Sequence, residues 1–126
     1  MSLKPQHIFV RHDGRFTKIV FADILYIESV KNFIRLHFEK HELMILISLR
    51  QMERELPDTF CRVHRSFIVN TSHMQSFDHE QVWFGKKWVP IALQFRDVLP
   101  KKVNIVLSET RSFSGMSKME IRNLLN

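Results

Sequence analysis

The segment CRVHRSFIVN, residues 61–70, places a histidine, an arginine and a serine directly before an apolar strand. One interpretation is nucleophilic catalysis, in which Cys61 attacks and His64 removes its proton. Side chains three residues apart in a strand point to opposite faces, so these two groups would not meet without a bend. We therefore predict that Cys61 is a small buried packing residue and that the chain is not an enzyme.

A metal site is the second interpretation, because imidazole groups are common metal ligands. The candidate ligands are His37, His41, His64, His73 and His79. They show no tight ligand spacing and there is no second cysteine, whereas structural zinc sites group such ligands closely. Histidines scattered over the surface explain the pattern more simply. The three glycines lie far apart and form no phosphate-binding loop, so we predict no metal and no cofactor.

Recognition of nucleic acid is the third interpretation. Arg65 can donate two hydrogen bonds to guanine, and Asn32 can pair with adenine, while Lys86 and Lys87 can neutralise phosphates. Each residue has an alternative: Arg65 as a buried ion-pair partner, Asn32 as a turn residue, and the two lysines as a solvated hairpin tip. Nineteen Lys and Arg against thirteen Asp and Glu give a net charge of +6, which favours acidic partners such as nucleic acid or an anionic membrane.

The length of 126 residues predicts a single domain. With one cysteine the chain can form no intramolecular disulfide, and we expect a reducing cytoplasm. The N-terminus lacks the apolar run of a signal peptide, and no segment approaches the roughly 18 apolar residues of a membrane span, so we expect no membrane partner. The first residues, MSLKP, look like an added leader, which suggests a fragment of a longer protein.

The first half of the chain predicts short strands. HIFVRH and RFTKIVF flank an Asp13-Gly14 turn, as in a hairpin, and the continuous apolar run from Ile24 to Ile27 indicates a central strand. FIRLHFEK and LMILIS form a second hairpin pattern. The period then changes: SLRQMERELP predicts a short helix that Ser48 caps and Pro57 ends.

The second half returns to strands. CRV and SFIVN precede a turn at 71–74, and QSFDH, QVWFG and KWVPI follow, the last two joined by a tip at residues 85–87. Residues 92–104 could form a helix that Pro100 must end or kink. We predict one domain over residues 1–107, followed by a linker and a short amphipathic helix over 108–126.

These patterns occur together in a family. The strand DILYIE, the segment from SL through a helix to LP, the block RVHRSFIVN, and VPIALQFRDVL after a hairpin resemble the LytTR DNA-binding domain of bacterial response regulators. The resemblance covers residues 23–99. It implies a mainly β fold, an elongated arrangement of short antiparallel strands with a few short helices, whose strand-end loops enter successive major grooves of promoter DNA.

The resemblance places Asn32 where the family reaches into one groove and residues 92–96 where it reaches the next. The chain departs from the family after its proline-containing strand, where many members carry Arg or Lys and this chain has Leu93 and Gln94; Gln94 can still pair with adenine. Together, the residues and the resemblance predict these DNA contacts: Lys31, Asn32, Arg35, His64, Arg65, Ser66, Lys86, Lys87, Gln94 and Arg96.

The resemblance further implies a sequence-specific DNA-binding domain of a bacterial transcriptional regulator, the output domain of a two-component system. An N-terminal receiver or other signalling domain would precede it, and the domain could dimerise on DNA. The chain itself contains no receiver motif. The alternative is a protein-interaction or ligand-sensing module on the same fold that has lost DNA reading.

Overall fold

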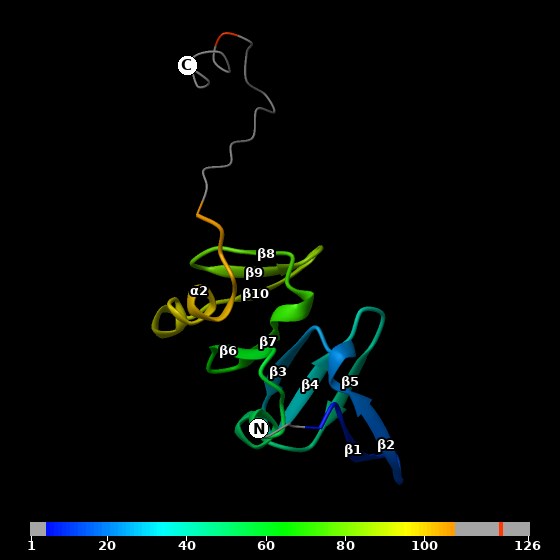
Figure 1. The fold of residues 1–126 in the computed structure, drawn as a ribbon. Helices are drawn as coiled ribbons and strands as arrows, with labels where there is room; N and C mark the ends of the chain where they lie inside the picture. Colours follow the sequence, from blue (N-terminus) through cyan, green and yellow to red (C-terminus); the bar gives the residue numbers. More distant parts are fainter. Residues whose placement is uncertain (1–4, 108–118, 120–126) are drawn as a thin grey trace.

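A computed structural model describes residues 5–107 and Met119 of the chain. The predicted linker and helix over residues 108–126 lie outside the described residues, apart from Met119. The described part contains three antiparallel sheets, of two, three and five strands, together with a few short helices (Figure 1). The predicted mainly β fold of short antiparallel strands is therefore confirmed.

The five-stranded sheet positions most of the predicted site residues. Its strands are β3 (Tyr26–Val30), β4 (Phe33–His37), β5 (Glu42–Ile45), β6 (Phe60–His64) and β7 (Phe67–Asn70), in the order β5-β4-β3-β7-β6. β3 lies in the middle, as its apolar sequence predicts. Tyr26 and Ile27, adjacent in β3, are both buried although they point to opposite faces. The sheet is therefore covered on both sides.

Two smaller sheets provide that cover. β1 (His7–His12) and β2 (Arg15–Val20) form the predicted hairpin, in which Asp13 and Gly14 both have positive φ, as a type I′ turn requires. On the other side, β8 (Ser76–Phe77), β9 (Gln81–Phe84) and β10 (Lys87–Pro90) form the three-stranded sheet. Figure 1 shows the five-stranded sheet between these two layers.

The helices are short. Helix α1 (Leu49–Glu53) begins after Ser48, whose Oγ accepts a hydrogen bond from the Gln51 amide at 3.0 Å, so the predicted N-cap is confirmed. The single-turn 3-10 helices are η1 (Phe21–Asp23), η2 (Thr71–His73) and η3 (Leu93–Phe95). η1 and η2 each connect strands of two different sheets, whereas η3 lies between β10 and the last described helix.

The expectation that residues 92–104 form one helix, ended or kinked by Pro100, is wrong. The segment forms η3 and a separate helix α2 (Val98–Lys102), and Pro100 lies inside α2 without ending it. Pro100 is the third residue of α2, where the backbone amide has no intrahelical partner, so a residue without an N–H costs no hydrogen bond there. The break falls earlier, at Arg96 and Asp97.

Two separate cores lie on the two faces of the five-stranded sheet. The first includes Ile19, Ile27, Leu36, Met52 and Phe60, and joins the β1–β2 hairpin and α1 to one face. The second includes Tyr26, Cys61, Val63, Val69, Val82, Val89 and Leu99, and joins the three-stranded sheet and α2 to the other. Because Cys61 is buried in the second core, burial raises the pKa of its thiol, which disfavours the nucleophilic thiolate.

Candidate nucleic-acid interface

Two strand turns that carry predicted contacts lie at the same end of the five-stranded sheet. Lys31 and Asn32 connect β3 to β4, and Arg65 and Ser66 connect β6 to β7. β3 and β7 are antiparallel neighbours, and the Ser29 amide at the end of β3 donates a hydrogen bond of 2.8 Å to the Ser66 carbonyl. The two turns are therefore side by side.

A third predicted segment joins this end of the sheet. The Ala92 amide donates a hydrogen bond of 2.9 Å to the Val63 carbonyl of β6, so residues 92–96 begin beside the last turn. In Figure 1 the yellow loop after β10 lies on the same side of the molecule as β6. We call residues 31–32, 64–66 and 92–96 together the turn end. Its three segments follow one another across the sheet.

Five of the ten side chains of the turn end are exposed, and each of its three segments carries at least one of them. Arg65 is exposed, and within the described part of the chain its side chain has no hydrogen-bond or ion-pair partner, so the alternative of a buried ion pair does not hold. Lys31, Asn32 and Gln94 are also exposed. Leu93 is 73% exposed. These groups are available for contacts with another molecule.

Lys31 adopts an unusual backbone conformation, with φ of +57°. A lysine there is strained by roughly 1 kcal/mol relative to glycine, because its Cβ crowds the backbone. Asn32 follows it with its side chain exposed, so it is both a turn residue and a candidate contact. The strain is consistent with a functional role for the lysine side chain.

Arg62, which sequence reasoning missed, braces the β6–β7 turn. Its Nε donates to the His64 carbonyl at 3.0 Å, one Nη donates to the Arg65 carbonyl, and the other donates to Glu53 Oε1 at 3.0 Å. His64 also serves the turn, because its Nδ1 accepts a hydrogen bond of 3.0 Å from the Ser66 amide. His64 is half-buried, which leaves only its Nε2 for a contact outside the turn.

Lys86 and Lys87 do not belong to the turn end. The Lys87 ammonium donates a 3.5 Å hydrogen bond to the Phe38 carbonyl, just beyond the end of β4. β4 begins next to Asn32 and runs away from it over five residues, about 16 Å at strand spacing. The lysine pair therefore lies at the opposite end of the sheet, on the β9–β10 turn, where Gly85 supplies a positive φ.

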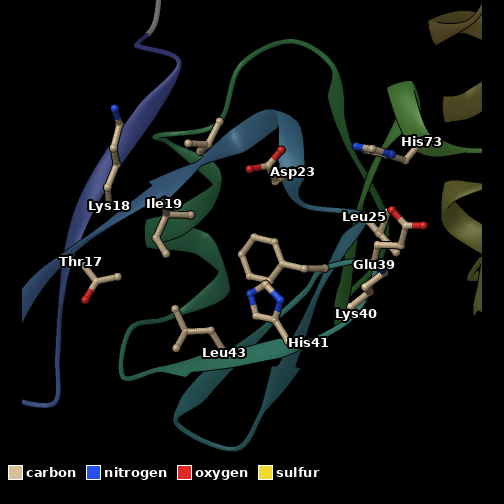
Figure 2. Close-up of a pocket in the computed structure, with 12 residues that line it drawn as sticks. Thr17, Lys18, Ile19, Asp23, Leu25, Glu39, Lys40, His41, Leu43 and His73 are labelled. Carbon is tan, nitrogen blue, oxygen red and sulfur yellow. The ribbon is translucent and has the colours of Figure 1, made fainter.

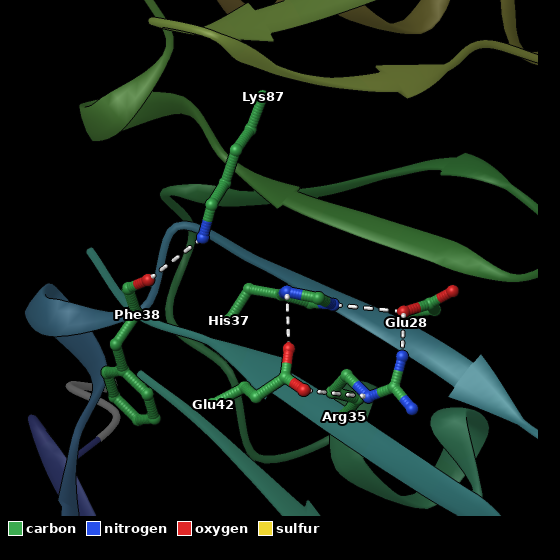
Figure 3. Close-up of polar contacts among 6 residues, drawn as sticks. All are labelled: Glu28, Arg35, His37, Phe38, Glu42 and Lys87. Atoms are coloured by element: carbon green, nitrogen blue, oxygen red, sulfur yellow. Dashed lines mark hydrogen bonds and ion pairs between the residues drawn. The ribbon is translucent and has the colours of Figure 1, made fainter. Parts of the chain in front are cut away.

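Arg35 is engaged within the fold. Its guanidinium lies 3.3 Å from Glu28 and 3.7 Å from Glu42, and His37 Nε2 lies 2.9 Å from Glu28 (Figure 3). His37 is buried and stacks on Tyr26 at 4.1 Å, so the interpretation of His37 as a surface histidine is wrong. A sequence of alternating residues does not reveal that both faces of β4 are covered.

Comparison with known proteins decides the family. The LytTr DNA-binding domain family model matches residues 14–104, which is most of the chain. The chain belongs to the LytTR family. The resemblance drawn from the motifs is therefore confirmed, and the match also takes in β2, which precedes residue 23.

Two curated relatives match parts of this LytTR domain. The CO-responsive transcriptional regulator RcoM of Rhodospirillum rubrum is 37% identical over 57 residues, 44% of this chain and 24% of the relative. The sensory transduction protein LytT of Bacillus subtilis is 28% identical over 93 residues, 66% of this chain and 37% of the relative. The chain thus spans about a quarter to just over a third of these relatives.

The solved structure is the LytTr DNA-binding domain of a putative methyl-accepting/DNA response regulator from Bacillus cereus. It matches with a TM-score of 0.65 and 23% sequence identity, covering 78% of this chain and 96% of that domain. At this identity the match supports the LytTR fold rather than any particular contact.

A hollow elsewhere on this LytTR domain has no single sign of charge. This hollow of about 520 Å³ lies between the β1–β2 hairpin and the β4–β5 turn, lined by both signs of charge, including Lys18, Asp23 and Lys40 (Figure 2). Among the described residues, no group of three or more His, Cys, Asp and Glu is arranged to hold a metal ion. Within the same residues, no helix is long and apolar enough to cross a membrane.

Proposed function

We propose that this LytTR domain binds double-stranded DNA in a sequence-specific manner through its turn end. One observation carries the proposal: the sheet topology aligns three exposed segments, each with hydrogen-bonding side chains, at one end of a rigid scaffold. Residues placed on adjacent turns can reach successive positions along a duplex, and exposed Arg, Asn and Gln are the side chains that read base edges.

The side chains of the turn end suit different parts of DNA. Arg65 can hold guanine O6 and N7 or clasp a phosphate, and Asn32 and Gln94 can each pair with adenine. Lys31 suits a phosphate. Leu93 replaces the cation that many LytTR domains carry there, and an exposed apolar side chain suits the methyl group of thymine. Arg35, Lys86 and Lys87 lie outside this proposed surface.

Arg96 completes the third segment. Its side chain is half-buried, and within the described residues its buried Nε has no hydrogen-bond partner. His64 and Ser66 contribute mainly through the turn that they stabilise. We therefore place Arg96 and His64 at the margin of the proposed contact surface.

The biological setting is part of the proposal. The relatives are longer and are described as a transcriptional regulator and a sensory transduction protein. We infer that the domain, residues 1–107, is the output part of a bacterial response regulator without enzymatic activity, acting in the cytoplasm behind a receiver or other signalling domain. Binding as a dimer would double the number of turn ends on the duplex.

Selection of duplexes from a random pool on the wild-type chain tests this function. We expect a defined consensus, and a log-log salt slope of about −2 to −4 for roughly two to four neutralised phosphates. The control duplex is a shuffled consensus, which should bind with similar salt dependence but much lower affinity. No enrichment together with a flat salt dependence would favour the alternative, a protein-interaction or ligand-sensing module that uses the exposed Leu93.

A further inference from the structure

The guanidinium of Arg62 occupies an unusual place in the fold, and we propose that Arg62 is a positioning residue that sets the geometry of the β6–β7 turn for DNA recognition. This inference rests on the proposed function of the turn end. It assigns no DNA contact to Arg62 itself. Instead, the residue fixes where the neighbouring Arg65 side chain begins.

The hydrogen bonds of Arg62 show how it does so. Each of its three guanidinium nitrogens has an acceptor: the carbonyls of His64 and Arg65 and the carboxylate of Glu53. Two of these bonds fix consecutive peptide groups of the turn. A planar guanidinium holds several acceptors in one rigid arrangement, which a lysine ammonium on a flexible stem cannot reproduce.

The third bond ties the turn to a separate element. Glu53 is the last residue of α1, and the buried Leu49 and Met52 anchor α1 in the first core. The turn itself extends from β6 and β7, whose Val63 and Val69 pack in the second core. Arg62 therefore braces the turn against a helix that packs on the first-core face of the sheet, where Phe60 of β6 and Ile68 of β7 are also buried.

A β-bulge explains why this brace is needed. Arg62 is opposite Ile68 and His64 is opposite Phe67, so Val63 is an extra residue with no partner in β7. A bulge interrupts the regular ladder and redirects the backbone. Here the freed Val63 carbonyl accepts from Ala92 and starts the third segment of the turn end. The next two carbonyls, of His64 and Arg65, accept hydrogen bonds from the Arg62 guanidinium.

The bulge and Arg62 thus both shape the turn end, each in a different way. The bulge attaches residues 92–96 to β6, and Arg62 stiffens the turn that the bulge would otherwise loosen. A turn held in one conformation binds more tightly, because less freedom is lost when the complex forms. Removing Arg62 should therefore weaken binding even though no DNA contact disappears.

A double-mutant cycle on the selected duplex tests this role. Arg62→Ala should weaken binding by about tenfold or more, the size expected when a positioned charged hydrogen bond is lost. In an Arg65→Ala background the same change should cost less than about twofold, because Arg62 acts through Arg65. The salt slope should change no more than Arg65→Ala changes it, because Arg62 itself contacts no phosphate.

Matched variants separate this role from a loss of charge or of folding. Arg54→Ala removes one cation next to α1 from an exposed side chain without a partner in the described chain, and should bind as the wild type does. Arg62→Lys should recover part of the affinity, and Glu53→Ala should cause a smaller loss than Arg62→Ala. If Arg62→Ala does not fold, the affinities of Arg62→Lys and Glu53→Ala still test whether Arg62 positions the turn.

Amide hydrogen exchange of the free protein provides a readout independent of DNA. The His64 to Ser66 amides should exchange faster in Arg62→Ala than in Arg54→Ala, while the β3 amides stay protected. Additive losses with a shallower salt slope would show that Arg62 contacts phosphate and would overturn the proposal, as would wild-type affinity in Arg62→Ala. Failure of every protein, wild type included, to bind any duplex would refute the proposed function, and the exchange rates would still test the brace.

Discussion

The two ends of the five-stranded sheet carry similar residue types in different circumstances. At the turn end, Arg65, Lys31 and Asn32 are exposed, and the hydrogen bonds of Arg62 hold the backbone of the β6–β7 turn that carries Arg65. At the opposite end, Lys86 is exposed on a glycine turn and Lys87 contacts the Phe38 carbonyl. Positive charge is present at both ends. If the proposed function is right, a DNA-reading surface needs side chains that are free while their backbone is fixed.

Among these variants, Arg65→Ala should cause the largest loss of DNA affinity. We expect binding to weaken by about 1–3 kcal/mol, because a bidentate contact is lost, with little change in the melting temperature since the side chain is exposed. Competition binding against duplexes changed at single positions measures it. If Arg65 contacts a base, the sequence preference should relax at one base pair. If it contacts a phosphate, the affinity should fall by the same factor for every duplex. Unfolding with unchanged affinity of the folded fraction would place Arg65 in the core.

Leu93→Ala sharpens the contrast by testing an apolar contact. We expect a several-fold loss of affinity, on the order of 1 kcal/mol for one buried methyl contact. Replacing thymine by uracil removes one methyl group from the duplex. At one position this should lower the affinity of the wild type by a similar factor, and it should leave the affinity of Leu93→Ala unchanged. Equal sensitivity of both proteins at every position would show that Leu93 contacts no thymine methyl.

Lys31→Gly should move stability and affinity in opposite directions. Removing the side chain relieves the strain of a positive φ, so stability should stay level or rise by up to about 1 kcal/mol. The salt slope should become shallower by about 0.9 if one phosphate contact is lost. Lys31→Ala is the control, since it removes the same charge and keeps the strain. A lower melting temperature for glycine than for alanine contradicts this expectation.

Lys86→Ala and Lys87→Ala should have the smallest effect. Because both lysines lie at the opposite end of the sheet, affinity should stay within about twofold and the salt slope should not change beyond error. Titration of the selected duplex at several salt concentrations measures both quantities. A slope that falls by about 2 in the double variant would extend the DNA surface to this end and remove the contrast.

The sequence predicted the elements well where the signal is local. The Asp13-Gly14 turn, the Ser48 cap and the alternating strands each depend on a few neighbouring residues, and all are found in the structure. Pro100 was misjudged because its effect depends on where the helix begins. A helix starting at Val98 places it in the first turn, where it does no harm.

The candidate site was harder to predict because it depends on which strands become neighbours. Arg65 and Asn32, predicted from their residue types, lie at the turn end, but Lys87 and Arg35, predicted on the same grounds, lie at the opposite end and in an ion pair. Arg62 was missed because its partner Glu53 lies nine residues away, beyond a helix end and a loop. The signal that could have found it is an arginine on the strand that leads into a two-residue turn.

The central position of β3 has a consequence for how the domain unfolds. Alternate residues of this strand belong to the two different cores, with Ile27 in one and Tyr26 in the other. Neither core can dissolve without exposing one face of the strand that the other core needs. We therefore expect both halves to melt in a single cooperative step, with the slowest-exchanging amides in β3. A destabilising change on either face should therefore lower the melting temperature of the whole domain.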